Sequence, residues 1–132
     1  MGEASPWIAI VDDDVSVLKA LTRLLRTRSL HAKTYSSARE FLGALPVGLP
    51  ECLILDLQMP EMSGLELLHD LTHRRIQIPI IIISAHGDIS MRERCKSAGA
   101  IAFLLKPVQD TSLFAAIDDA SRIAKDRSHP SS

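Results

Sequence analysis

The sequence has little of several features that mark whole classes of protein. Its 132 residues include only two cysteines, Cys52 and Cys95, which are too few for a disulfide scaffold and favour free thiols in a cytosolic protein. No apolar run approaches the roughly 20 residues that span a bilayer, and the opening residues MGEASPW lack the basic and apolar regions of a secretory signal. We therefore expect a cytoplasmic protein with no membrane segment.

An excess of charge of either sign is also missing. Fifteen lysines and arginines face sixteen aspartates and glutamates, so the formal net charge is −1. A chain without an overall basic field is a poor nucleic-acid binder by itself. The sequence does have a hydrophobic fraction of 46% over 132 residues, which suits one domain with one substantial core.

Apolar runs alternate with amphipathic segments along most of the chain. The expected strands are residues 6–11, 31–35, 51–56, 78–84 and 101–105. The expected helices are 15–28, 36–45, a helix opened by Ser63, 88–98 and a last helix opened by Asp110. Apolar strands separated by helices favour a parallel sheet with helices on both faces. We predict a doubly wound α/β fold with five parallel strands and five helices.

Polar residues are expected to cap several of these helices. Asp14 stands directly before the first amphipathic segment and is interpreted as a helix cap rather than a metal ligand. Asp110 is expected to cap the last helix in the same way. Two pairs fit the capping-box pattern, namely Ser37 with Glu40 and Ser63 with Glu66.

Polar side chains follow four of the five expected strands. Asp12 and Asp13 end the first, Asp56 the third, Ser84 the fourth, and Lys106 follows the fifth. Right-handed crossovers bring the carboxyl ends of parallel strands to one edge, where ligands bind. Three carboxylates at one edge would not all stay ionised without a cation. Oxygen ligands without histidine or cysteine favour Mg²⁺ over zinc.

The lysine and the hydroxyl indicate what else this edge binds. A metal ion, an ammonium group and a hydroxyl around one carboxylate suit an anionic group such as phosphoryl. A carboxylate can itself attack phosphorus and form an acyl phosphate. The residues therefore predict a magnesium-dependent phosphoryl site.

Four motifs carry a family resemblance. The segments IVDDD, LILDLQMPEMSG, IIIISAHGD and AGAIAFLLKPV, in this order and spacing, resemble the receiver domain of two-component response regulators, the CheY-like family. The resemblance covers residues 7–125, and the HGD segment and the loop after Asp56 are most similar to FixJ-type transcription factors. It implies the strand order 2-1-3-4-5, a receiver domain over 1–125, and a polar tail or interdomain linker over 126–132.

The resemblance also implies how the acidic residues act. Asp56 would be the phosphoacceptor and a ligand of Mg²⁺. Asp13 would bind the metal directly, Asp12 mostly through a water molecule, and Gln58 through its backbone carbonyl. Lys106 would hold the phosphoryl group and neutralise its charge.

Further residues would respond to phosphorylation. By the resemblance, Ser84 would hydrogen-bond the phosphoryl group and move towards it, and Phe103 occupies the aromatic switch position. Ser84 replaces the commoner threonine and Phe103 the commoner tyrosine, so a switch that uses the tyrosine hydroxyl is in doubt here. Phe103 is equally well interpreted as a core residue. The Lys106–Pro107 peptide bond is expected to be cis.

Two exposed positions near the acceptor suggest a tuning role. Gln58 lies two residues beyond Asp56, and His86 lies two residues beyond Ser84. We hypothesise that this pair controls the access of water to the phosphorylated aspartate and so sets the lifetime of the phosphoryl group.

The expected partners follow from the family. A sensor histidine kinase would donate the phosphoryl group, and the protein would take part in its own phosphorylation and dephosphorylation without being an enzyme for other substrates. The output would be transcription through a C-terminal DNA-binding domain absent from this sequence, so DNA would be contacted only through that domain. The alternative is a stand-alone single-domain receiver in a phosphorelay.

A surface for partners is expected beside the fourth helix. Residues 88–98 carry Arg92, Arg94 and Lys96 but few large apolar residues, which indicates a solvated face. The alternative is an output surface, because the face made by the fourth helix, fifth strand and fifth helix often mediates homodimer formation in this family.

Three other functions fit the sequence less well. A flavodoxin-like cofactor binder needs small or hydroxyl residues in its first loop, whereas Asp12, Asp13 and Asp14 would repel a phosphate. A haloacid-dehalogenase-like phosphatase needs an acid two residues after its nucleophile, and that residue here is Gln58. A pseudo-receiver that is never phosphorylated is disfavoured, because the acidic, serine and lysine residues are all present.

Overall fold

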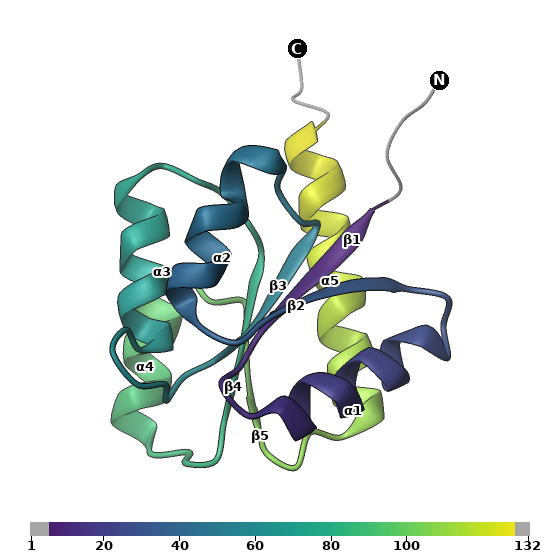
Figure 1. Cartoon of the computed structure of the whole chain (residues 1–132). Coiled ribbons are helices and arrows are strands. Elements are labelled where there is room, and N and C mark those ends of the chain that lie inside the picture. The colour runs from purple at the N-terminus through teal and green to yellow at the C-terminus, as the bar shows by residue number, and fades with distance from the viewer. Residues whose placement is uncertain (1–5, 129–132) are drawn as a thin grey trace.

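Five short strands alternate with five α-helices along residues 6–128, the part of the chain that the computed structural model describes (Figure 1). The elements are β1 (Trp7–Val11), α1 (Val15–Arg26), β2 (His31–Tyr35), α2 (Ala38–Ala44), the 3₁₀ turn η1 (Leu45–Val47), β3 (Cys52–Asp56), α3 (Gly64–His73), β4 (Ile80–Ser84), α4 (Ile89–Ser97), β5 (Ala102–Leu105) and α5 (Asp110–Ser128). Within these residues, no helix is long and apolar enough to cross a membrane.

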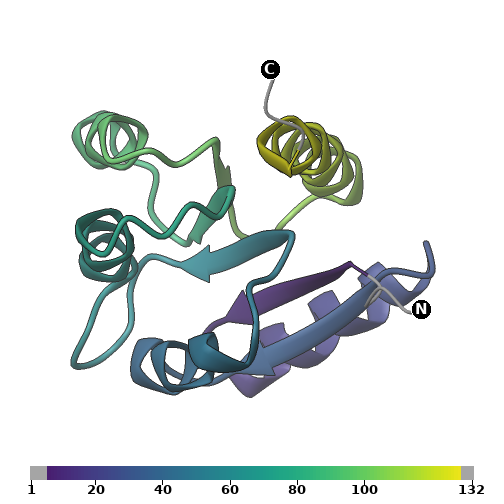
Figure 2. The same ribbon diagram turned by 90° about the horizontal axis from the view of Figure 1, so that it is seen from above.

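The strands form one parallel sheet in the order β2-β1-β3-β4-β5. In Figure 2, which views the sheet from above, α1 and α5 cover one face and α2, α3 and α4 cover the other. The predicted doubly wound fold and its strand order are confirmed. The parallel arrangement brings the carboxyl ends of the strands to the same edge.

The central strands are apolar throughout because each of their faces is buried. In β1, Ala9 and Val11 pack in the core beneath α2, α3 and α4, whereas Ile8 and Ile10 pack in the core beneath α1 and α5. All residues of β3 and β4 are buried, and their apolar residues divide between the same two cores. Cys52 and Cys95 are buried free thiols, as the sequence predicted. Two-sided burial positions the strand ends rigidly.

Side-chain caps fix where two of the helices begin. The Asp14 carboxylate accepts a hydrogen bond from the Ser16 N–H at 2.9 Å, which confirms Asp14 as the cap of α1. The capping box of Ser63 and Glu66 at α3 is complete. The two caps therefore fix the far ends of the loops that follow β1 and β3.

Two predicted helix starts were wrong in detail. The Ser37 hydroxyl accepts from the Glu40 N–H at 3.1 Å, but the Glu40 carboxylate accepts from the Ser36 N–H at 2.6 Å rather than from Ser37. The second half of the capping box is therefore displaced by one residue. Asp110 is the first residue of α5 rather than the residue before it. A carboxylate in the first turn still interacts favourably with the helix dipole.

The ends of most predicted elements also differ by one or two residues. The first helix stops at Arg26 instead of residue 28, and β4 begins at Ile80, after Pro79, which has no N–H for the sheet. Helix α5 continues to Ser128, so the first residues of the expected tail over 126–132 are helical. Residues 129–132 lie outside the described residues, and the domain division at residue 125 stays a prediction.

A close backbone approach at Gly64 shapes the loop after β3. The Gly64 N–H donates to the Leu57 carbonyl oxygen at 2.8 Å. A Cβ atom at position 64 would lie 2.9 Å from the Leu57 Cα and would collide with the Asp56 carbonyl oxygen. Glycine is therefore needed here because any side chain would push α3 away from the end of β3.

We predict that Gly64→Ala lowers the free energy of unfolding by about 2–4 kcal/mol, because the added methyl group meets backbone atoms that cannot rotate away. Gly43→Ala is the matched control, since Gly43 lies within α2 and no atom would lie within 4 Å of its Cβ. That change should be neutral or stabilise the protein by up to about 1 kcal/mol. Urea unfolding measures both, and equal effects at the two positions would contradict the steric account.

Candidate functional site

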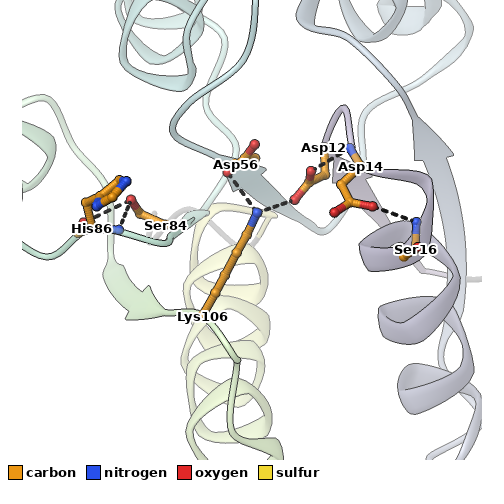
Figure 3. Close-up of polar contacts among 7 residues, drawn as sticks. All are labelled: Asp12, Asp14, Ser16, Asp56, Ser84, His86 and Lys106. Carbon is orange, nitrogen blue, oxygen red and sulfur yellow. Dashed lines mark hydrogen bonds and ion pairs between the residues drawn. The ribbon is translucent and has the colours of Figure 1, made fainter.

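The carboxyl edge of the sheet gathers the polar residues that the sequence singled out (Figure 3). Asp12 follows β1, Asp56 ends β3, Ser84 ends β4 and Lys106 follows β5. Asp12 and Ser84 are 0% exposed and Asp56 is 3% exposed, whereas Asp13 is exposed. The sheet therefore holds two buried carboxylates side by side, with a third at the rim.

A single ammonium group joins the two buried carboxylates. Lys106 Nζ lies 3.0 Å from Asp12 Oδ2 and 3.2 Å from Asp56 Oδ1. The Lys106 N–H donates to the Ser84 carbonyl oxygen at 2.8 Å, which ties the start of this loop to the end of β4. The peptide bond from Lys106 to Pro107 is cis, as predicted. Figure 3 shows the lysine side chain reaching between the two aspartates.

The donor set fits a hard divalent cation. Carboxylate oxygens of Asp12, Asp13 and Asp56 all lie within 4.8 Å of one another, and neither histidine nor cysteine belongs to the cluster. Asp12 Oδ1 accepts from the Asp14 N–H at 2.9 Å, and the buried Oδ2 has no partner among the described residues besides the Lys106 ammonium, 3.0 Å away. One ammonium against three carboxylates leaves negative charge that Mg²⁺ would neutralise.

Burial and neighbouring charges change how the site ionises. Burial raises the pKa of Asp56 from 3.8 to about 6, and the charge of Asp12 adds to this rise while Lys106 opposes it. Burial alone would lower the pKa of Lys106, but hydrogen bonds and charges from Asp12 and Asp56 outweigh burial and raise it. The lysine therefore stays protonated, and its charge is shared by two carboxylates.

The Ser84 hydroxyl is engaged away from Asp56. It donates to the His86 carbonyl oxygen at 2.9 Å and accepts from the His86 N–H at 3.1 Å. Figure 3 shows this pair to one side of the cluster formed by Asp12, Asp56 and Lys106. The His86 backbone contact was not predicted, because no sequence pattern indicates that a loop folds back on a serine hydroxyl. The hydroxyl proton of Ser84 is therefore donated to the His86 carbonyl in this structure.

The remaining predicted residues surround the cluster rather than join it. The side chains of Gln58 and His86 are exposed in the loops that follow β3 and β4. Phe103 is half-buried on β5, where the guanidinium carbon of Arg92 lies 5.2 Å from its ring centroid. This cation–π contact could not be predicted from residue spacing, since the two residues belong to different elements.

Comparison with known proteins finds a matching family model and several similar proteins. The family model described as the response regulator receiver domain matches residues 8–118. The response regulator protein TmoT of Ectopseudomonas mendocina is 47% identical over 94% of this chain and 56% of its own length. The transcriptional regulatory protein FixJ of Rhizobium meliloti is 41% identical over 86% of this chain and 56% of its own.

Solved structures of two response regulators are similar to this chain in both fold and sequence. A crystal structure titled FixJ-N has a TM-score of 0.82 and 39% identity, and covers 91% of this chain and 96% of that one. The response regulator StyR has a TM-score of 0.87 and 42% identity, and covers 96% of this chain and 64% of that one. The chain spans about half the length of the curated relatives it matches.

We predict that Asp56→Asn stabilises the protein at pH 7.5 when divalent cations are removed by chelation. The folded-state pKa of Asp56, about 6, lies above its ordinary value of 3.8, so the parent loses stability as pH rises through this window. The loss is essentially complete by about pH 7 and corresponds to roughly 2–3 kcal/mol. Asparagine cannot ionise, so the variant does not undergo this loss of stability.

Thermal and urea unfolding at pH 4 and pH 7.5 measure this difference. Glu93→Gln is the matched control, because Glu93 is an exposed carboxylate on α4 and its neutralisation should have little effect at either pH. A difference between Asp56→Asn and the parent that is the same at both pH values would contradict the account.

Proposed function

The chain belongs to the response regulator receiver domain family, and from this premise we propose that Asp56 accepts a phosphoryl group from a sensor histidine kinase. The observation that carries the proposal is the Lys106 ammonium, which lies within ion-pair distance of Asp56 and Asp12 at the carboxyl edge of the sheet. A nucleophilic carboxylate and a fixed cation at one point are what phosphoryl transfer to aspartate requires.

In the proposed reaction an Asp56 oxygen attacks the phosphorus of a phosphohistidine. The new bond joins carboxylate oxygen to phosphorus, the phosphorus–nitrogen bond breaks, and the imidazole leaves with the electron pair and takes up a proton. Lys106 compensates the charge of the acyl phosphate. Asp12, Asp13 and Asp56, with the backbone carbonyl of Gln58, would hold Mg²⁺, whose charge would offset that of the phosphoryl oxygens.

Phosphorylation would then change the loop after β4. The Ser84 hydroxyl now binds the His86 backbone, and it would exchange this partner for a phosphoryl oxygen. Because the His86 contacts hold the loop in its present conformation, their loss would shift the population of conformers at α4. Phe103, half-buried on the neighbouring strand, would respond to that shift.

The output is proposed from the relatives. Proteins named as transcriptional regulatory proteins match this chain over about half of their length, so we propose that the domain controls transcription through a C-terminal DNA-binding domain. A stand-alone receiver in a phosphorelay is the second candidate. Dimer formation through α4, β5 and α5, and a cytoplasmic location, belong to the same proposal.

We predict that acetyl phosphate with Mg²⁺ adds about 80 Da to the protein, the mass of one phosphoryl group. Intact-protein mass spectrometry measures the adduct. Asp56→Asn should remove it, whereas Asp70→Asn, which changes a partly exposed acid on α3 paired with Arg74, should retain it. An adduct that survives Asp56→Asn, or no adduct in the parent, would overturn the proposal.

We also predict that Gln58→Ala and His86→Ala change the lifetime of the phosphoryl group by about threefold or more, which is a small change in the activation barrier for hydrolysis. Both side chains are exposed in the loops that follow β3 and β4, where they would control the approach of water to Asp56. Gln77→Ala is the control, because this exposed glutamine precedes β4 at the opposite edge of the sheet. Lifetimes that match the control in both variants would exclude a tuning role.

A further inference from the structure

Arg92 differs from the other cations of α4 in its surroundings. Its guanidinium carbon lies 5.2 Å from the centroid of the Phe103 ring, a distance at which a cation is attracted to an aromatic face. Arg94 and Lys96 have no such contact among the described residues, and none of the three forms an ion pair there. The contact therefore joins α4 to β5 through one specific pair.

The Phe103 ring has room to move. It lies at a groove of about 320 Å³ between α4 and β5 that Arg92, Cys95, Lys96 and Ala100 also line. One side of the ring packs against the core beneath α2, α3 and α4. Phenylalanine has no hydroxyl group that a hydrogen bond could fix, so its position depends on this packing and on Arg92.

Phe103 is also close to Ser84 in the sheet. Ile82 pairs with Phe103, and Ser84 pairs with Leu105. Since side chains alternate along a strand, all four lie on the same face of the sheet. Leu105 in turn lies against the loop after Ser84, where a Cβ at Gly87 would be 2.6 Å from Leu105 Cδ2. A movement of Ser84 and its loop therefore changes the space beside β5.

Helix α4 is held weakly, which gives one contact influence over its position. Of its nine residues, only Cys95 is buried. An element with few buried apolar contacts shifts at low free-energy cost. The Arg92–Phe103 contact therefore adds to the few contacts, among them Cys95 in the core, that hold α4 beside β5.

We infer that Arg92 is a positioning residue that holds Phe103 in its unphosphorylated place and so opposes the rearrangement of Ser84 towards Asp56. This inference rests on the proposed phosphorylation of Asp56. The contact is present while Ser84 binds the His86 backbone. A ring that moved into the space vacated by Ser84 would leave the guanidinium group. A contact made in only one of two conformers shifts their populations by its own free energy.

Removing the cation should therefore favour the phosphorylated conformer. We expect Arg92→Gln to tighten the binding of beryllofluoride with Mg²⁺, a phosphoryl analogue, by about two- to fivefold, the range for an exposed cation–π pair. Arg92→Lys keeps a cation and should stay close to the parent. Arg94→Gln removes an equal charge from the same helix without touching the ring and should leave the affinity unchanged.

Fluorine NMR of protein labelled with 4-fluorophenylalanine follows the ring itself, because the chain has only three phenylalanines. The Phe103 resonance, assigned with Phe103→Leu, should move in free Arg92→Gln towards its position in the beryllofluoride complex. Arg92 is exposed, so the variant should melt close to the parent.

The outcomes separate the two proposals. A parent protein with no acetyl phosphate adduct and no beryllofluoride binding would overturn the proposed function, and this inference with it. A parent that responds while Arg92→Gln matches it in affinity and in the Phe103 resonance would overturn the inference alone. An equal effect of Arg94→Gln would do the same, because net charge rather than the ring contact would then be the cause.

Discussion

The structure depends on one electrostatic constraint, the placement of three carboxylates and a single ammonium at one edge of a sheet. Asp12 and Asp56 are buried at neighbouring strand ends, and the charge of Lys106 is divided between them. Burying unbalanced charge is costly, so the folded protein tolerates this arrangement only because packing elsewhere outweighs it. The same imbalance makes the site receptive to a divalent cation. Burial, and to a smaller extent the charge of Asp12, raises the pKa of the carboxylate proposed to react.

The rest of the fold serves to keep those groups in place. Parallel strands buried on both faces fix the ends from which the aspartates project. Asp14 caps the helix that follows the first strand, and Gly64 lets the third helix approach the end of β3. By contrast, α4 has one buried residue and is the element best able to move. A rigid acceptor beside a weakly held helix is suited to convert a local change of charge into a change of surface.

Much of this could be predicted from the sequence, because it depends on patterns that alternate along the chain. Apolar strands separated by helices predicted the sheet, and the polar residues at the ends of four of the strands predicted the acidic cluster and Lys106. What could not be predicted depends on side-chain direction. Asp12 and Asp13 are adjacent in the sequence, yet one is buried and the other exposed, since neighbouring residues at a strand end point to different sides. The engagement of Ser84 by the His86 backbone and of Phe103 by Arg92 likewise depends on loop conformation and helix rotation, for which residue spacing carries no signal.

The most direct test of the central claim is the effect of Mg²⁺ on thermal stability. A ligand that binds only the folded state stabilises it by about 2.7 kcal/mol at 100 times its dissociation constant. The account predicts that the melting temperature rises by several degrees and saturates with Mg²⁺ concentration, and that Asp13→Asn, which removes an exposed carboxylate of the cluster, abolishes most of the rise. A melting temperature that Mg²⁺ leaves unchanged, or that rises equally in Asp13→Asn, would contradict it.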